Sequence, residues 1–144
     1  MEEQISKCDA VVNFAAESFV DRSISESNPF LVSNIRGSYT LLDIVTKQKK
    51  RMIQISTDEV FGSLATGTAT EESKLNPSNP YAATKAAAEL LINSYFLSFN
   101  SDVVVTRCTD MNYPLAREVS NIVILLFSLF KRGFSLIPHK RKKT

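Results

Sequence analysis

The sequence predicts an α/β fold in which a parallel sheet is flanked by helices. Two observations predict this fold class. Short apolar runs rich in β-branched residues alternate along the chain with longer segments of helical periodicity. Polar residues follow each apolar run, which is where parallel sheets place their ligand sites. With 144 residues, 44% of them hydrophobic and 22% charged, the chain fits one domain with a buried core.

The first expected strand is the apolar run 9–16, which is typical of a buried parallel strand. A helix is expected next, with Asn28 as its N-cap and Pro29 in its first turn. The apolar residues of this helix recur at roughly helical spacing: Leu31, Ile35, Leu41, Leu42 and Val45.

The second half of the chain repeats the alternation. A second strand is expected at 52–55, followed by a loop at 62–80 that is rich in Gly, Ser, Thr and Pro. The length of this loop suggests a functional segment. The alanine-rich stretch 81–99 predicts a strong helix, 103–108 a third strand, and 119–131 a last apolar helix.

Composition excludes several classes of function. The 17 basic and 15 acidic residues give a net charge of +2, so no nucleic-acid binding is expected, and residues 138–144 read as a solvated basic tail. Two cysteines, Cys8 and Cys108, are too few for a disulfide framework and favour a cytoplasmic location. The first residues do not resemble a signal peptide. The longest apolar run, 122–127, is too short to span a membrane.

Reactive side chains gather after the second strand and at the start of the alanine-rich helix. Thr57, Asp58 and Glu59 supply a hydroxyl and two adjacent carboxylates. Tyr81 and Lys85 lie four residues apart and therefore share a helix face. Together these groups can move two protons and assist a hydride transfer, whereas each part alone is common on protein surfaces. No metal site is expected.

The glycines do not form the phosphate-binding turn that begins most dinucleotide-binding sheets. The chain has four glycines, and none of them are spaced as that turn requires: Gly37, Gly62, Gly67 and Gly133. Either the protein binds no dinucleotide, or the chain is the second part of a dinucleotide-binding sheet and lacks its Gly-rich N-terminal βαβ half.

Five segments of the chain, in this order, resemble the dTDP-glucose 4,6-dehydratases: 13–18, 20–24, 56–62, 79–89 and 106–109. These enzymes are lyases of the extended short-chain dehydrogenase/reductase (NAD-dependent epimerase/dehydratase) superfamily. The Thr-Asp-Glu sequence distinguishes the dehydratases from the epimerases, which share only the Tyr and Lys. The resemblance implies a partial Rossmann-like sheet, with residues 1–144 as the central and C-terminal part of an NAD(P)-binding Rossmann domain.

The resemblance also implies a role for each reactive residue. In these enzymes NAD takes a hydride from C4 of the sugar, water leaves across C5 and C6, and the hydride returns to C6. Tyr81 would take the C4 hydroxyl proton, and the charge of Lys85 would favour its phenolate. Thr57 would hydrogen-bond the C4 oxygen. Asp58 would protonate the departing C6 hydroxyl, and Glu59 would remove the C5 proton.

Further residues are implied to bind the cofactor or the substrate. For NAD these are Phe14, Ala15, Ala16, Glu17, Ser33, Ser56, Tyr81 and Lys85. For a nucleotide-sugar substrate of the dTDP-glucose type they are Ser18 and Thr57. The expected protein partners are a second copy of the chain, forming a homodimer through the helix at 81–99, or a complementing N-terminal half.

Three positions depart from the pattern of these enzymes. Phe19 stands where they carry histidine, and Asp110 and Met111 stand where they carry two asparagines. Met111 cannot replace the hydrogen bonds of an amide. These departures keep two alternatives open. One is a sugar-nucleotide epimerase or reductase of the same superfamily, and the other is a non-catalytic remnant or interaction module.

Overall fold

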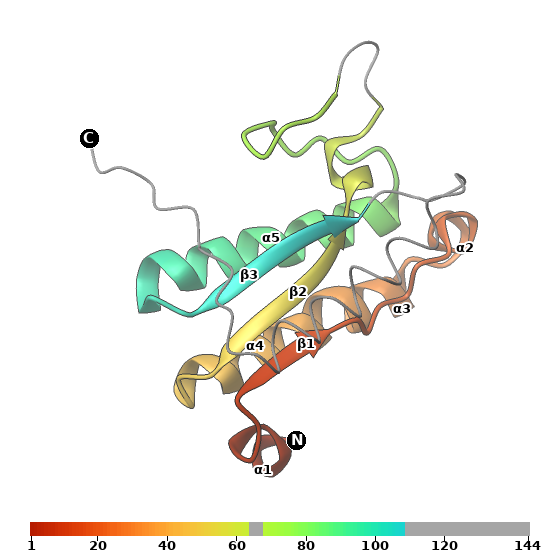
Figure 1. Ribbon diagram of the computed structural model, residues 1–144. Coiled ribbons are helices and arrows are strands. Elements are labelled where there is room, and N and C mark those ends of the chain that lie inside the picture. Colours follow the sequence, from red (N-terminus) through yellow and green to blue (C-terminus); the bar gives the residue numbers. More distant parts are fainter. Residues whose placement is uncertain (64–67, 109–144) are drawn as a thin grey trace, which may run out of the picture. The chain divides into compact units, whose positions relative to one another are not determined.

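A three-stranded parallel sheet organises the chain, as expected for an α/β fold (Figure 1). The computed structural model describes residues 1–63 and 68–108. The strands are β1 (Ala10–Asn13), β2 (Arg51–Thr57) and β3 (Val103–Cys108), in the order β1-β2-β3. Both strand pairs are parallel, so the three carboxyl ends lie at the same edge of the sheet.

Strand β1 is shorter than the expected run 9–16, because its last residue turns the chain out of the sheet. The side-chain oxygen of Asn13 accepts a hydrogen bond of 3.1 Å from the amide of Ala15. Such a local bond competes with the strand ladder. The Asn13 amide nitrogen donates to Gln54 on β2 at 2.9 Å and to Ser38 at 3.3 Å, and these contacts hold the turn in place.

Four consecutive helical segments connect β1 to β2. They are α2 (Val20–Ser25), α3 (Asn28–Phe30), the π-helical η1 (Leu31–Gly37) and α4 (Ser38–Lys47). The expected N-cap at Asn28 is wrong by one residue, since Ser27 precedes the helix and its carbonyl accepts the amides of Phe30 and Leu31. Helix α2 and the N-terminal α1 (Glu2–Ser6) were not expected, because such short helices show no apolar period.

The connection from β2 to β3 contains a 3-10 turn, a loop and one long helix. The turn is η2 (Asp58–Phe61), and the helix is α5 (Pro80–Phe99), close to the expected 81–99. Asn79 caps α5, and Pro80 occupies its first turn. The helix ends at Asn100, which adopts the left-handed conformation common at helix C-termini.

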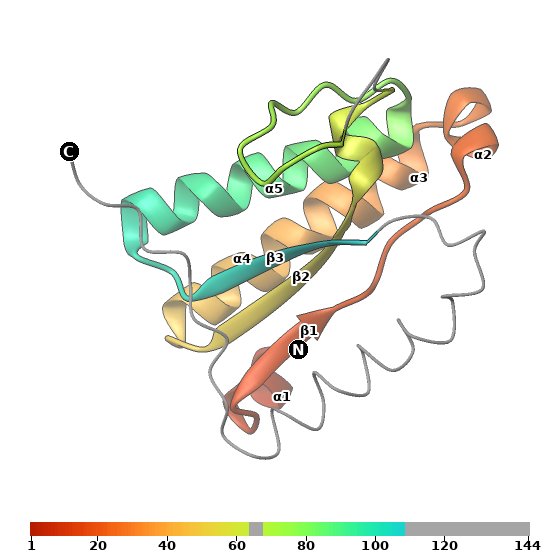
Figure 2. The same ribbon diagram turned by 45° about the horizontal axis from the view of Figure 1, so that its top comes forward.

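Helices α4 and α5 lie side by side on one side of the sheet (Figures 1 and 2). Met52 on β2 packs against Ile44 and Val45 of α4 and against Ile5. Because side chains alternate along a strand, Gln54 and Ser56 lie on the same helix-covered face as Met52.

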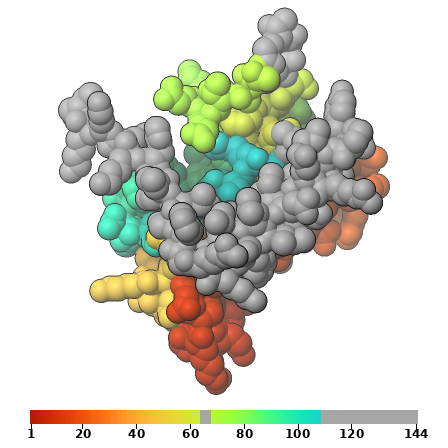
Figure 3. Space-filling model, viewed as in Figure 1, coloured from red at the N-terminus to blue at the C-terminus, as the bar shows by residue number. Residues whose placement is uncertain are grey.

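A second apolar cluster fixes the turn that follows β2. Val60 and Phe61 of η2 pack against Ala86 of α5, with Leu75 from the loop. The space-filling view shows the loop after residue 67 beside this turn (Figure 3). Burial of Val60, which is completely inaccessible to solvent, therefore anchors the turn that carries the two candidate carboxylates.

Several expectations concern residues outside the described part of the chain. They are the helix at 119–131, the basic tail at 138–144, and the substitutions Asp110 and Met111. Within the described ranges, no helix combines the length and the apolar character needed to cross a membrane.

Candidate active site

The two candidate carboxylates lie directly at the carboxyl end of β2, in the turn η2. Thr57 ends the strand in an extended conformation, and its hydroxyl oxygen accepts the amide of Glu59 at 3.2 Å. The same hydroxyl donates to a carboxylate oxygen of Asp58 at 3.4 Å. Thr57 is buried, whereas Asp58 and Glu59 are half-buried. The turn thus holds both carboxylates at the edge where the strand ends, and water still reaches them.

Asn79 connects this turn to the start of α5. Its side-chain nitrogen donates to Oε2 of Glu59 at 2.8 Å. Its side-chain oxygen accepts the amide of Ala82 at 2.8 Å, which is an N-cap bond. Sequence reasoning did not include Asn79 in the site. An asparagine before Pro80 is a signal for a helix cap, but the contact with Glu59 depends on the tertiary fold.

The first turns of α5 carry Tyr81 and Lys85. The ring of Tyr81 packs edge-to-face against buried Phe30, with 6.5 Å between the ring centroids. The backbone amide of Tyr81 donates to the hydroxyl of Ser23 at 3.1 Å, so α2 helps to position this end of the helix. The ammonium group of Lys85 donates to the carbonyl of Ile55 on β2 at 2.6 Å.

Burial lowers the pKa of Lys85 below its ordinary value of 10.5, and the charges of Glu89 and Cys108 oppose this shift in part. The lysine is 6% exposed, so its charge lies among backbone and side-chain atoms instead of water. The backbone carbonyl of Ile55 thus fixes the position of this buried amine beside the carboxyl end of β2.

A buried ion pair that was not predicted joins α5 to β3. Arg107 contacts the Glu89 carboxylate through Nη2 at 2.6 Å and through Nε at 3.1 Å. The Glu89 side chain is 5% exposed and that of Arg107 27%. The Arg107 guanidinium also lies over the Phe61 ring, 4.9 Å from its centroid. Arg107 therefore contacts both the helix of Lys85 and the turn of the candidate carboxylates.

The loop after β1 is attached to the π-helical segment by Asn34, which is 1% exposed. The side chain of Asn34 accepts the amide of Glu17 and donates to its carbonyl, both at 2.9 Å. It also donates to the hydroxyl of Thr84 on α5 at 2.9 Å. π-helical turns are frequent at functional sites. This asparagine was not predicted either, and the sequence carries no local signal for it.

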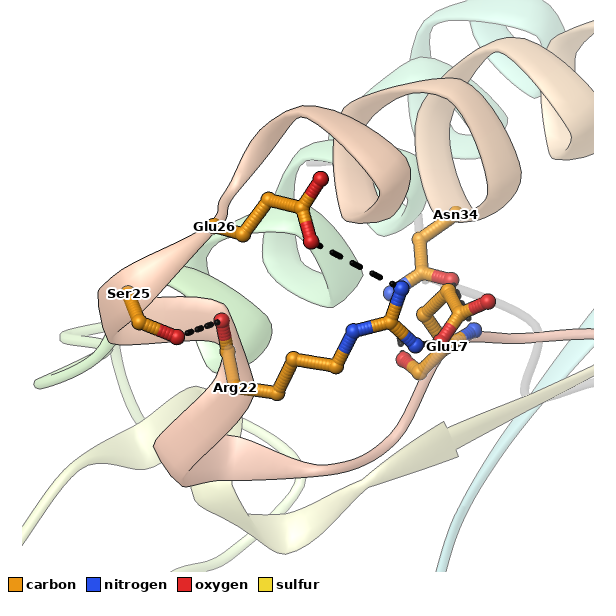
Figure 4. A network of polar contacts seen from close by, with 5 residues as sticks. All are labelled: Glu17, Arg22, Ser25, Glu26 and Asn34. Atoms are coloured by element: carbon orange, nitrogen blue, oxygen red, sulfur yellow. Dashed lines mark hydrogen bonds and ion pairs between the residues drawn. The ribbon is translucent and has the colours of Figure 1, made fainter.

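The Glu17 side chain lies in a polar network with α2 (Figure 4). Arg22 reaches Glu17 at 3.2 Å and Glu26 at 3.8 Å, and its carbonyl accepts the hydroxyl of Ser25. The Glu17 carboxylate is therefore paired with a cation, while its backbone is held by Asn34.

The residues expected to contact NAD occupy four segments of the chain: the loop after β1, η1, the end of β2 and the start of α5. Four of them, Phe14, Ala15, Ala16 and Glu17, lie in the loop after β1 with Ser18, one of the two residues expected to contact substrate. Ser33 lies in η1 and Ser56 near the end of β2, while Tyr81 and Lys85 lie on α5. Phe14 and Ala15 are exposed, and Ala16 and Ser33 are half-buried. Phe19, which departs from the pattern, is also exposed, at the N-cap of α2.

Ser56 gives a structural test of whether a ligand fits this edge. Its hydroxyl oxygen is buried and has no hydrogen-bond partner within the described part of the chain. Buried hydroxyls almost always have a partner, so a polar group from a ligand would satisfy this one. The exposed small side chain of Ala15 leaves the backbone after β1 open to close approach. These residues fit a bound dinucleotide.

Comparison with known proteins gives an independent view of the chain. The sequence model of the GDP-mannose 4,6 dehydratase family matches residues 2–132. Low-salt glycan biosynthesis protein Agl12 of Haloferax volcanii is 45% identical over 108 residues, which are 74% of this chain and 35% of that protein. A dTDP-glucose 4,6-dehydratase of an Actinoplanes species is 45% identical over 124 residues, which are 85% of this chain and 38% of that protein.

A solved structure supports the same assignment. DesIV, a dTDP-glucose 4,6-dehydratase of Streptomyces venezuelae whose crystal structure contains NAD, superimposes with a TM-score of 0.70 at 34% identity. The match covers 94% of this chain and 44% of DesIV. The chain thus spans little more than a third of the length of the curated relatives that it matches. The resemblance to dTDP-glucose 4,6-dehydratases is confirmed, and the chain belongs to the NAD-dependent epimerase/dehydratase family of sugar-nucleotide enzymes.

Proposed function

We propose that this chain carries the central catalytic segment of a dTDP-glucose 4,6-dehydratase-like enzyme, a lyase that acts on a nucleotide sugar. One observation carries the proposal. The turn with Asp58 and Glu59 is connected through the cap residue Asn79 to the helix whose first turns carry Tyr81 and Lys85. Two carboxylates and a Tyr/Lys pair are the groups needed to oxidise a sugar carbon and then eliminate water.

Tyr81 and Lys85 would serve the oxidation at C4. When bound, NAD supplies the hydride acceptor. Tyr81 takes the proton of the C4 hydroxyl, which an unperturbed tyrosine with a pKa of about 10 would do poorly at neutral pH. Lys85, one helical turn from Tyr81, would favour the phenolate form when protonated, since an opposite charge nearby stabilises an anion. The carbonyl of Ile55 keeps the Lys85 amine at the end of β2.

Asp58 and Glu59 would serve the elimination. Glu59 removes the C5 proton, which the neighbouring 4-keto group has made acidic, and Asp58 protonates the departing C6 hydroxyl. The Thr57 hydroxyl separates the two roles physically, because it bonds the carboxylate of Asp58 but only the backbone amide of Glu59. The C4 oxygen would receive a hydrogen bond from Thr57.

The loop after β1, together with Ser33 and Ser56, would hold the cofactor in this proposal. The partnerless hydroxyl of Ser56 supplies one polar contact, and Ala15 and Ala16 permit close backbone approach. Residues 1–144 would then be the central and C-terminal part of an NAD(P)-binding Rossmann domain. A complementing N-terminal half, as part of a longer protein or as a partner, would supply the remaining contacts to the cofactor.

A homodimer is the second part of the proposal. Leu90 and Leu97 are exposed, and because they are seven residues apart they share one face of α5. Exposed Tyr39 on α4 packs edge-to-face against Tyr95 of α5. Leu90→Lys with Leu97→Lys should convert a dimer into a monomer in light scattering, whereas Ile24→Lys, at an exposed position on α2, should not. A monomeric wild-type chain would contradict this part.

An epimerase or reductase of the same family is the alternative that product analysis can separate. Only a dehydratase produces a 4-keto-6-deoxy sugar. The 4,6-dehydratase proposal expects dTDP-glucose to give that product and expects Glu59→Gln and Tyr81→Phe to abolish it. Glu71→Gln, at an exposed loop position, and Tyr95→Phe, on the same helix, are the matched controls. Full activity in both site variants would contradict the proposal.

NAD binding separates an enzyme from a non-catalytic interaction module. A specific ligand at 100 times its Kd raises the free energy of unfolding by about 2.7 kcal/mol, which a thermal unfolding curve detects. A rise in Tm with NAD in the wild-type chain, reduced in Ser56→Ala, supports the cofactor site. An unchanged Tm together with no product favours the interaction module.

A further inference from the structure

We propose that Asn79 is a positioning residue that orients the Glu59 carboxylate relative to the start of α5. This inference deepens the proposed function, and it rests on it for the role of Glu59 as the base. The amide of Asn79 makes two hydrogen bonds of 2.8 Å at once, one to Glu59 and one to the helix backbone. It is therefore a single side chain that joins a candidate base to the helix of the Tyr/Lys pair.

The orientation of the Asn79 amide follows from its partners. The backbone N–H of Ala82 can only donate, so the amide oxygen must face it. The amide NH₂ group must then face the opposite way, where Oε2 of Glu59 accepts from it. A flipped amide would place two donors together and leave the carboxylate facing an oxygen. The helix cap thus fixes which end of Asn79 meets Glu59.

Glu59 is held by two hydrogen bonds, one at its backbone amide and one at a carboxylate oxygen. Its backbone amide is fixed by Thr57, and Oε2 is fixed by Asn79. In the described ranges, Oε1 makes no hydrogen bond and no Lys or Arg forms an ion pair with Glu59. A neutral donor orients the carboxylate without adding a cation, which leaves the other oxygen available to accept a proton.

Helix capping alone does not account for asparagine at this position. Asp, Ser and Asn cap helices about equally well, because a side-chain oxygen is all that the cap requires. Asp offers no donor, and the Ser hydroxyl carries its one donor on the capping oxygen itself, on a shorter side chain, whereas the amide has a separate donor nitrogen that reaches Glu59. Replacing Asn79 with Ser or Asp therefore keeps the cap and changes only the contact with the carboxylate.

The first experiment follows the Asn79 side-chain amide by NMR in the full chain. Removing the acceptor with Glu59→Ala should move the Asn79 side-chain amide protons toward the shifts of Asn93, an exposed asparagine on the same helix, and should speed their exchange with water. The Asn93 signals should not change. An Asn79 amide that is indifferent to Glu59→Ala would overturn the proposal, whether or not the chain has dehydratase activity.

The second experiment is kinetic and compares Asn79→Ser, Asn79→Asp and the control Asn93→Ser on dTDP-glucose. Asn79→Ser should lower kcat about tenfold, and Asn79→Asp should lower it further because a second carboxylate would face Glu59; KM should change little. Urea unfolding should show Asn79→Ser and Asn93→Ser close to wild type, since neither removes the cap oxygen, and Asn79→Asp somewhat less stable, since it brings two carboxylates together. Wild-type kcat in both Asn79 variants would overturn the proposal. The two proposals can fail separately. If the wild-type chain forms no product but the Asn79 amide still responds to Glu59→Ala, the dehydratase proposal is contradicted and the contact between Asn79 and Glu59 stands.

Discussion

Replacing Arg107 with methionine is expected to lower the free energy of unfolding by about 3 kcal/mol, because it leaves a buried carboxylate without its cation. The Glu89 side chain is 5% exposed and receives contacts of 2.6, 3.1 and 3.2 Å from Arg107. Breaking a buried pair costs about 3–5 kcal/mol, and the 27% exposure of Arg107 favours the lower end, since water can reach the cavity.

The loss is measurable by urea unfolding at neutral pH. With a slope of about 2 kcal/mol per molar urea, the unfolding midpoint of Arg107→Met should fall by about 1.5 M. The matched control is Arg51→Met, which breaks a pair of 2.8 Å with Asp102 on the surface. Exposed pairs are worth about 0–1 kcal/mol, so the control should shift the midpoint by less than about 0.5 M.

A double variant tests whether the loss of stability comes from the unpaired, buried Glu89 carboxylate or from the packing that the Arg107 side chain provides. Glu89→Leu combined with Arg107→Met removes both charges and should recover most of the stability, since apolar replacement of a buried pair is often neutral. Equal midpoints for Arg107→Met and Arg51→Met would refute the reasoning. So would a double variant that is no more stable than Arg107→Met, because the unpaired carboxylate would then not be the cause.

Three further variants test other features of the fold. Burial lowers the pKa of Lys85 in the folded chain, so at pH values between that lowered pKa and 10.5 the unfolded chain binds more protons. The free energy of unfolding should therefore rise with pH over this range. Lys85→Met should lack this rise when urea unfolding is repeated across the same pH range. Gly62→Ala should lower the free energy of unfolding by more than about 1–2 kcal/mol, since Gly62 has a φ of +69° and an added Cβ would lie 2.1 Å from the Asn76 carbonyl oxygen. An unchanged thermal unfolding curve would contradict this. Phe30→Ala should lower the free energy of unfolding by about 3–5 kcal/mol, because Phe30 is fully buried against Tyr81. A smaller loss of stability in calorimetry would mean that the neighbouring side chains fill the cavity.

Local patterns in the sequence predicted the elements that are long or strongly periodic. The alanine-rich helix was predicted at 81–99 and found as Pro80–Phe99, and the third strand was predicted within the bounds that the structure has. Alternation of these elements was enough to predict a parallel sheet, because parallel strands need a long crossover connection. The family resemblance rested on short motifs and is confirmed. The catalytic roles of Asp58 and Glu59 stay predictions.

The tertiary structure alone decided which polar side chains meet. Asn79 reaches Glu59 across 20 residues, Arg107 reaches Glu89 across 18, and Asn34 reaches Thr84 across 50. Such contacts depend on the register of β2 with β3 and on where α5 begins, and neither is encoded in a local period. The sequence by itself determined the longer elements, the parallel sheet and the family. The packing of α5 against the sheet decided how the candidate residues are held, because buried polar groups must find partners wherever the fold brings them.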